Sequence, residues 1–506
     1  MDFHYPTKEN VHNRACAAVG KTMRELITAM DNKASAKKSQ VGYAWESWFG
    51  RNTSNLAGKD LIAADVELKS TGVIDTKNGK SAKERLVLNV INYIDEYQTS
   101  FYNSSFWAKN NRMEICFYAY DKEKNWLDFE VLKTILFEFP ENDLRIIQQD
   151  FDVIQQYINT GRAHELSESL TMYLGACPKG ANKHSVRDQH PDLNAPKAMQ
   201  RAYCLKNSYM TYLVRNYVFG DLKDERIRTN PFDDKVDIIP VKTVNESLMA
   251  EMDEANFKQY ANLEEYINTR VEKWIGKSQS EIATIFGILP DAKGNFPKNI
   301  NAMLVSRMLG IKGNIEKTEE FQKAGVVVKT IRVEHNGTIE QHMSFPAFKF
   351  KELARETWED STLKTFFEST KFFFVVFKKD AQGELFFQGT KFFTILQSDI
   401  DGKIKAVWQD TVDKLNEGVV LKNTAKNPKS KPIISNNFIK ASEQMITHVR
   451  PHATTASYIA NSGSSDELPV KAKWEARPAG YSDSWMTSQC FWLNNDYILE
   501  HVKDLI

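Results

Sequence analysis

The sequence is poor in cysteine, has no long apolar run and carries no excess of charge of either sign. Its 5 cysteines are scattered without a CxxC pair, which excludes a zinc ribbon and is typical of a reducing compartment. No apolar run reaches the roughly 18 residues that a membrane-spanning helix needs, and the N-terminus lacks the basic and apolar regions of a secretory signal. We therefore expect a cytoplasmic protein with no membrane contact.

The net charge of zero argues against indiscriminate binding of polyanions. Two local stretches, 173–220 and 418–458, nevertheless hold more Lys and Arg than Asp and Glu. Such stretches are as often solvated faces as DNA-binding surfaces, so they leave both interpretations open. With 506 residues the chain is too long for a single hydrophobic core, and two large domains fit this length best.

An internal repeat divides the chain. Residues 221–254 are rich in Asp, Glu and Lys around two prolines and show no sustained periodicity, which is typical of a linker. Strand-like and helix-like blocks recur in one order on both sides of it. We therefore predict one α/β (α+β) unit used twice, as a first copy over 1–220 and a second copy over 255–506. The paired blocks are 19–22 with 275–278, 46–50 with 306–310, 58–71 with 318–331, the expected strands 113–118 with 372–377, the expected helices 151–158 with 407–415, then 177–181 with 450–453, and 203–209 with 491–497.

The first copy contains acidic residues with the spacing D-x6-E-x-K, formed by Asp60, Glu67 and Lys69. If 66–69 is a strand, its period of two places Glu67 and Lys69 on one face, and a preceding turn returns Asp60 to that face. Two converging carboxylates supply hard oxygen ligands for Mg²⁺, which lowers the pKa of a water. Lys69 can orient that water and offset charge on a phosphorane. Glu46, on the preceding helix, is expected to complete the acidic, metal-binding cluster.

The alternative is that Glu67 and Lys69 form only an exposed ion pair, which is the usual meaning of this short pattern. The repeat favours the catalytic interpretation. In the second copy, Lys329 remains, whereas Ser306, Glu320 and Val327 stand at the positions of Glu46, Asp60 and Glu67. A valine cannot ligate a metal, so the pair of copies is interpreted as one active site and one degenerate site.

These residues resemble the active-site region of MutH, the mismatch-repair endonuclease family that nicks DNA at GATC. The resemblance extends over most of the first 220 residues and rests on the blocks 46–50, Asp60 and 67–71. It implies a PD-(D/E)XK nuclease fold in two tandem domains, hydrolysis of double-stranded DNA with Mg²⁺, and a bacterial cytoplasmic location. It also implies that Lys109 lies near the scissile phosphate.

The resemblance further assigns DNA-reading residues. The block 178–182 is similar to the family's P-K-A-A-N recognition element, and 205–209 to a later L-K-K-N-F block, which implies DNA contacts from Pro178, Lys179, Cys204 and Lys206. Two departures matter, because Cys177 replaces a family arginine and Cys204 replaces the tyrosine that senses adenine methylation. Sensitivity to methylation is therefore in doubt.

The second copy keeps residues suited to DNA at the corresponding positions, namely Arg450, His452 and Trp492. An arginine is well suited to bidentate contact with guanine. The duplicated layout is closest to the larger two-domain restriction endonucleases that cut at GATC. We therefore expect a type II restriction endonuclease whose first copy cleaves, with or without DNA-induced dimerisation, and whose second copy binds a second DNA site as an effector. A MutH-like nickase and a non-catalytic DNA-binding regulator remain the alternatives.

Overall fold

A computed structural model describes residues 5–28, 40–50, 58–180, 185–229, 246–249, 259–427 and 430–506. The chain divides into two compact units. Unit 1 comprises Met1–Ile267 with Ser306–Val327, and unit 2 comprises Asn268–Val305 with Val328–Ile506. Segment 306–327, which belongs to the second copy by sequence, is thus grouped with unit 1. Most of the predicted linker 221–254 lies outside the described residues, and the domain boundaries stay a prediction.

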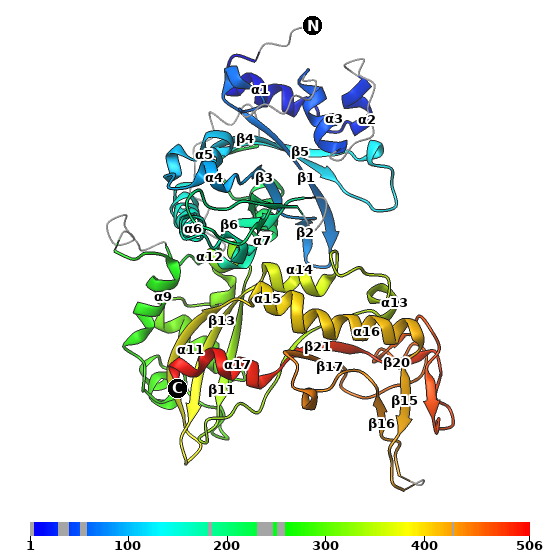
Figure 1. Cartoon of the computed structure of the whole chain (residues 1–506). Helices are drawn as coiled ribbons and strands as arrows, with labels where there is room; N and C mark the ends of the chain where they lie inside the picture. The colour runs from blue at the N-terminus through cyan, green and yellow to red at the C-terminus, as the bar shows by residue number, and fades with distance from the viewer. Residues whose placement is uncertain are drawn as a thin grey trace. The chain divides into compact units, whose positions relative to one another are not determined.

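Unit 1 is built on a five-stranded mixed sheet in the order β10-β5-β4-β1-β2. β1 and β4 run parallel, and the other neighbouring strands of this sheet pair antiparallel. Three N-terminal helices gather at one end of this sheet in Figure 1 and share a hydrophobic core with its strands. The elements are α1 (Lys8–Cys16), α2 (Met23–Thr28), α3 (Gln40–Trp48), β1 (Glu67–Thr76), β2 (Gly79–Ala82), β4 (Arg112–Ala119), β5 (Val131–Glu138) and β10 (Ile227–Arg228).

A second, three-stranded sheet of unit 1 has the order β3-β9-β6. The longest helix, α6 (Glu141–Asn159), contacts β6 with an apolar face spaced at helical intervals. This confirms the helix expected over 151–158. The other elements here are β3 (Leu86–Val90), α4 (Tyr93–Glu96), α5 (Ser105–Asn110), β6 (Leu174–Pro178), β7 (Val186–Arg187), β8 (Ala198–Met199), β9 (Arg201–Leu205), α7 (Asn207–Leu213) and, from the second copy, α12 (Glu319–Ala324).

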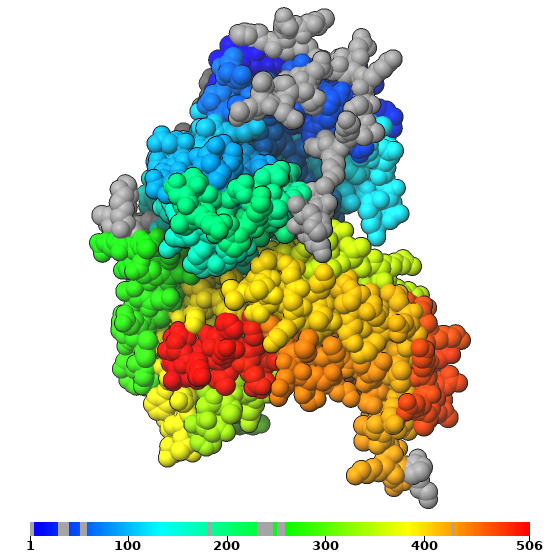
Figure 2. Space-filling model, in the orientation of Figure 1, coloured from blue at the N-terminus to red at the C-terminus, as the bar shows by residue number. Residues whose placement is uncertain are grey.

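Unit 2 carries sheets in the orders β11-β13-β14, β12-β21-β17 and β16-β15-β19, with a further pair β18-β20. The C-terminal helix α17 (Asn495–Val502) lies at the surface of this unit, in red in Figure 2. Its strands are β11 (Val326–Val333), β12 (Met343–Ala347), β13 (Lys371–Lys379), β14 (Leu385–Phe393), β15 (Val420–Asn423), β16 (Ile434–Asn436), β17 (Thr447–Pro451), β18 (Ser465–Glu467), β19 (Lys473–Glu475), β20 (Trp485–Thr487) and β21 (Gln489–Leu493). Its other helices are α9 (Leu263–Glu272), α10 (Gln279–Ile285), α11 (Ile300–Met308), α13 (Phe350–Leu353), α14 (Thr362–Ser369), α15 (Gln397–Asp399) and α16 (Lys405–Glu417).

The predicted repeat is visible in the backbone of both copies. Gly20 has φ 82° and donates its N–H to the Val131 carbonyl over 2.9 Å. Gly276 has φ 81° and donates to the Phe387 carbonyl over 2.8 Å. A positive φ is the backbone region that favours glycine, so the same residue type is retained at the same turn.

The three-stranded sheets β3-β9-β6 and β12-β21-β17 also share one register. Cys204 of the central strand pairs with Val87 and Gly175, and Trp492 pairs in the same way with Ser344 and His448. One step along, Ala202 faces Cys177, and Cys490 faces Arg450. The recognition-like blocks that the sequence pairs therefore occupy equivalent strands.

Two general features complete the description. Among the described residues, no helix is both long enough and apolar enough to cross a membrane. All five cysteines are free thiols, and four of them are buried. Thiols therefore contribute to packing in both units.

Candidate active site

The predicted catalytic strand forms as expected. β1 begins at Glu67 and lies between β4 and β2 in the main sheet of unit 1. Val66 and Leu68 pack into the hydrophobic core beneath the N-terminal helices. Glu67 and Lys69 share the opposite direction because successive side chains of a strand alternate. The Glu67 side chain is only 3% exposed, so this is not the solvated surface pair of the alternative interpretation.

The turn before β1 returns Asp60 to the start of the strand. A short 3-10 helix, Ile62–Ala64, is closed by a bridge between Leu61 and Val66. The Asp60 carboxylate then accepts a hydrogen bond from the Leu68 amide over 3.1 Å. The Asp60 amide donates in turn to Glu67 Oε2 over 3.2 Å. The two carboxylates are thereby held side by side, as the D-x6-E-x-K spacing predicted.

Two lysines meet one oxygen of Glu67. Lys69 Nζ lies 2.8 Å from Glu67 Oε1, and Lys109 Nζ lies 3.6 Å from the same atom. Lys109 comes from the last turn of α5, directly before β4. The parallel pairing of β1 with β4 places Glu67 opposite Met113 and brings that helix end beside the acid. The structure therefore joins Lys109 to the predicted group.

The electrostatics of this site centre on Glu67. Burial raises the pKa of its carboxyl, Lys69 and Lys109 lower it, and the neighbouring Asp60 raises it further. Burial and a like charge both disfavour the ionised form, whereas cations favour it. An acid in such surroundings gains from a divalent cation, because that cation offsets both carboxylates at once.

Glu46 lies on α3, which contacts β1. In the part of the chain that the structure describes, no three His, Cys, Asp or Glu side chains are grouped as they would be to hold a metal ion. The predicted three-carboxylate cluster is therefore not assembled. Mg²⁺ needs only one or two protein carboxylates because it retains several of its waters. The hard oxygens of Asp60 and Glu67 fit this requirement.

The DNA-contact residues predicted in the first copy separate into two groups. Pro178 and Lys179 are exposed at the end of β6, next to residues 181–184, which lie outside the described part of the chain. Cys204 and Lys206 are buried, and the Lys206 ammonium donates to the Thr171 carbonyl. The structure does not support the prediction that these two side chains contact DNA, because neither reaches the surface.

The predicted residues of the second copy do come together in unit 2. Arg450 lies over the Trp492 ring, with its guanidinium carbon 5.1 Å from the ring centroid. His452 contacts Cys490, the residue that faces Arg450 across the strand pair. Arg450 and His452 are exposed, whereas Trp492 is half-buried. An arginine held over an indole keeps donors free for a base edge while the ring fixes its direction.

The counterparts of the catalytic residues have other partners. Ser306 Oγ accepts the Ile315 amide over 3.1 Å. Glu320 accepts the amides of Leu248 and Met249 over 3.0 and 3.1 Å. In the second copy, the side chains of Ser306 and Glu320 thus accept hydrogen bonds from backbone amides.

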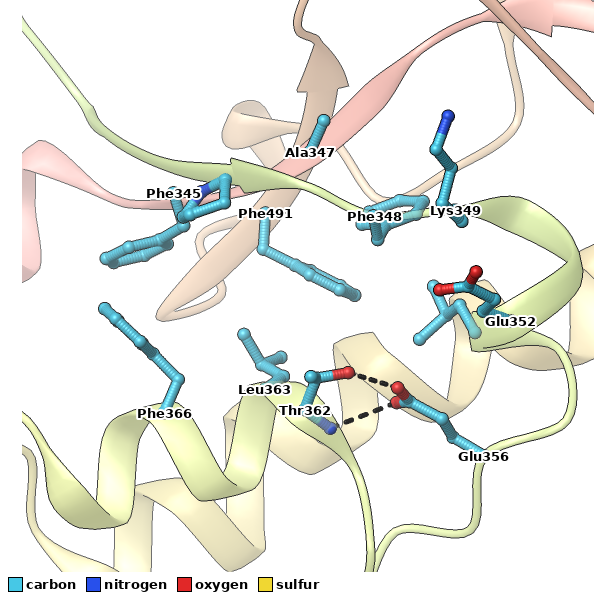
Figure 3. Close-up of a pocket in the computed structure, with 12 residues that line it drawn as sticks. Phe345, Ala347, Phe348, Lys349, Glu352, Glu356, Thr362, Leu363, Phe366 and Phe491 are labelled. Carbon is cyan, nitrogen blue, oxygen red and sulfur yellow. Dashed lines mark hydrogen bonds between the residues drawn. The ribbon is translucent and has the colours of Figure 1, made fainter. Parts of the chain in front are cut away.

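Unit 2 also contains an apolar cavity of about 240 Å³, between β12 and α14. Figure 3 shows the rings of Phe345, Phe366 and Phe491 directed toward it. At its rim, the Glu356 carboxylate accepts hydrogen bonds from the hydroxyl and amide of Thr362. Its mainly apolar lining differs from the acidic site of unit 1, so we do not regard it as a second hydrolytic centre.

Sequence reasoning did not single out four residues close to this site, namely Lys59, Asp65, Asn111 and Arg112. Lys59 Nζ contacts Asp65 and Asn111, and Arg112 contacts Asp65 as well. A signal was present in the repeat, because Glu319 and Gly325 stand at the positions of Lys59 and Asp65.

A mixed sheet with an acidic pair and lysines beside its central parallel strands is the arrangement expected of a nuclease of the MutH type. The family model described as DNA mismatch repair enzyme MutH matches residues 49–150, a stretch that includes Asp60, Glu67, Lys69 and Lys109. The chain is also 42% identical over 524 aligned residues to the type II restriction enzyme Sau3AI of Staphylococcus aureus, covering 99% of each protein. The chain therefore belongs to the MutH-related restriction endonucleases represented by that enzyme.

Proposed function

We propose that this protein is a type II restriction endonuclease that hydrolyses phosphodiester bonds of double-stranded DNA at GATC. The observation that carries the proposal is the convergence of Asp60, Glu67, Lys69 and Lys109 at the start of β1. The full-length similarity to a type II restriction enzyme supports cleavage of both strands over nicking. Because the substrate is DNA, we place the reaction in the bacterial cytoplasm.

In the proposed reaction, the oxygen of a water forms a bond to phosphorus while the bond from phosphorus to the leaving sugar oxygen breaks. The Asp60 and Glu67 carboxylates would hold Mg²⁺, which when bound polarises the phosphate and lowers the pKa of the water. Lys69 orients the attacking water, and Lys109 offsets the negative charge that develops on the phosphate oxygens. We propose that Glu46 assists these residues from α3, the helix that contacts β1.

We further propose that the second copy binds a second DNA site and modulates cleavage. The exposed arrangement of Arg450, His452 and Trp492 supports a DNA-reading role. Val327 at the position of Glu67 supports the absence of hydrolysis there. In the first copy, Pro178 and Lys179 are the exposed candidates for DNA contact. With one proposed site per chain, cutting both strands requires two sequential nicks or a dimer formed on DNA.

Plasmid digestion tests the proposal directly. The parent protein with Mg²⁺ should convert a supercoiled plasmid carrying several GATC sites into discrete linear fragments, and EDTA should prevent this. Glu67→Ala should leave the plasmid supercoiled. The matched control is Glu123→Ala, which alters an exposed glutamate in the same unit and should cut like the parent.

Four outcomes would contradict the proposal. Relaxed circles that are never linearised indicate a nickase, and full cutting by Glu67→Ala places the hydrolytic centre elsewhere. A parent protein that binds DNA but never cuts it indicates a regulator. Mapped fragment ends that do not fall at GATC reject the proposed sequence specificity.

A further inference from the structure

Asp65 adopts an unusual backbone conformation two residues before Glu67. Its φ and ψ are 55° and 46°, in the left-handed region. L residues other than glycine enter this region at a cost of about 1 kcal/mol, although Asp tolerates it better than most. The residue directly follows the short 3-10 helix, and only Val66 separates it from β1. Glycine would adopt this backbone conformation without strain, so the backbone alone does not account for an aspartate at this position.

The second copy shows what the backbone alone requires. Gly325 ends α12 with φ and ψ of 66° and 35°, directly before β11. The local sequences are Ala64-Asp65-Val66-Glu67 and Ala324-Gly325-Val326-Val327. The turn is therefore the same in both copies, and the degenerate copy uses the residue that forms it without strain. The contacts of the Asp65 side chain must therefore account for the aspartate at this position.

The Asp65 carboxylate holds two cations. Lys59 Nζ lies 2.8 Å from Oδ1 and also donates to the Asp65 carbonyl over 3.0 Å. Arg112 Nη1 lies 3.2 Å from Oδ2. Lys59 further donates to the Asn111 side-chain oxygen over 2.5 Å. The Lys59 side chain is only 4% exposed, whereas that of Asp65 is 61% exposed. The buried ammonium is therefore the partner whose geometry is fixed, because a charge withdrawn from water requires its hydrogen bonds.

These contacts connect the three chain segments that carry the proposed catalytic groups. Lys59 immediately precedes Asp60, Asp65 comes two residues before Glu67, and Asn111 comes two residues after Lys109. We propose that Lys59 and Asp65 are positioning residues, which fix the two carboxylates and Lys109 at their mutual distances. This inference rests on the proposed function, because it concerns the same site. The second copy has Glu319 where the first has Lys59, and it has no such acidic pair to position.

The decisive variant is the double substitution Lys59→Met with Asp65→Gly. The double substitution removes the left-handed aspartate and the buried ammonium together, so neither charge is left without its partner. Arg112 keeps its 2.7 Å contact with Glu138. We expect a thermal midpoint within a few degrees of the parent and a fall in kcat of about 10–100-fold, because small misplacements of catalytic groups have effects of that size. The Mg²⁺ concentration for half-maximal rate should rise, and KM for DNA should change little.

The single variants and a control sharpen this test. Lys59→Arg keeps the cation and should recover most of the rate that Lys59→Met loses. The matched control is Asp75→Ala, which removes the exposed ion pair with Lys80 at the other end of β1 and should leave kcat and the Mg²⁺ dependence unchanged. The losses from Lys59→Met and Asp65→Gly should be less than additive, because both break one contact.

The results separate this inference from the function on which it rests. If Glu67→Ala cuts DNA like the parent, the proposed site itself is wrong. If Glu67→Ala is inactive but the double variant keeps the parental kcat and Mg²⁺ dependence, Lys59 and Asp65 do not position the site. The inference is also overturned if the double variant loses activity only in proportion to its loss of folded protein, because the role would then be structural.

Discussion

The turn over 59–67 and its counterpart over 319–327 each place one left-handed residue, Asp65 and Gly325, before a strand, and they differ in use. In the first, Asp60 and the buried Glu67 lie side by side with two lysines. In the second, Glu320 accepts backbone amides. Like charges held together out of water raise the energy of the folded protein, whereas satisfied carboxylates lower it. The first turn therefore has the arrangement that the proposed chemistry needs, and the second has one that favours stability.

The second turn also contributes a buried cation to unit 1. Lys323 of α12 contacts both oxygens of Asp143 at 2.7 and 2.8 Å and Glu319 at 2.5 Å. Burial opposes the charge of Lys323, but Asp143 and Glu319 raise the pKa of this lysine above its ordinary value. The Tyr209 hydroxyl donates to the same Asp143 carboxylate over 2.8 Å. Segment 306–327 is thus anchored within unit 1 by a satisfied polar network.

The largest expected effect comes from the catalytic turn. Asp60→Asn should reduce the cleavage rate about 10²–10³-fold, because it removes a charged oxygen ligand for the cation that stabilises the reacting phosphate. The amide oxygen can still accept from Leu68, and the repulsion with Glu67 disappears, so the thermal midpoint should stay level or rise. Rates on a GATC duplex and thermal unfolding measure both quantities.

Asp75→Asn is the control for this prediction, since it changes an exposed aspartate of β1. The comparison between the two turns fails if Asp60→Asn cuts at the parental rate. It also fails if the variant loses several degrees of stability, because Asp60 would then hold the fold together as its counterpart does.

The second prediction concerns stability at the second turn, where the first concerned activity. Lys323→Met should lower the free energy of unfolding by about 3–5 kcal/mol, because Asp143 is left buried without its cation. Denaturant unfolding measures this loss, and exposed Lys317 provides the control Lys317→Met. The double variant Asp143→Leu with Lys323→Met should recover much of the loss. A change below about 1 kcal/mol for Lys323→Met would show that this turn is not an anchor.

Local patterns predicted most of the geometry of the candidate site. The alternation over 66–69 indicated the strand, and the D-x6-E-x-K spacing indicated the return of Asp60, because both depend on residues within one turn and one strand. The helix expected over 407–415 lies within α16, and the strands expected over 113–118 and 372–377 lie within β4 and β13. These confirmed predictions all rest on short-range periodicity.

Long-range packing accounts for the rest. Cys204 and Lys206 belong to or follow β9, the central strand of its sheet, and residues far away in the sequence cover them. Periodicity alone does not show that residues of a central strand such as β9 are covered on both faces of the sheet. The sequence also did not predict the left-handed backbone of Asp65, because a single residue type does not specify φ. Only the comparison with Gly325 indicates that the aspartate has a particular use.

The third prediction concerns DNA reading by the second copy. In a Glu67→Gln background, which prevents cleavage, Arg450→Ala should weaken binding of a second GATC duplex about tenfold, the effect of one lost base contact. Arg477→Ala, which alters another exposed arginine of unit 2, serves as the control. Equal affinity of the Arg450 and Arg477 variants for the second duplex would remove Arg450 from the proposed DNA-reading surface.

The smallest expected effect concerns His448, which lies beneath that surface. Burial, helped by His342 and Arg450, lowers the pKa of His448 to about 4. Between this value and the ordinary value near 6.5, the unfolded chain binds a proton that the folded chain does not, so stability falls as the pH drops through this window.

His448→Phe should abolish this contribution, which amounts to about 1 kcal/mol at pH 5.5, while its ring keeps the packing against Trp492 and His342. Thermal midpoints measured from pH 7.5 to pH 5 should therefore decline less steeply for His448→Phe than for the parent, and exposed His335→Gln should follow the parent. Parallel declines for His448→Phe and the parent would mean that His448 takes up its proton as readily in the folded protein as in the unfolded chain. The histidine would then belong to a hydrated groove. In the first copy Gly175 occupies the corresponding strand position, so this measurement also tests whether the second copy replaced that glycine with a dry, packed ring that supports Trp492.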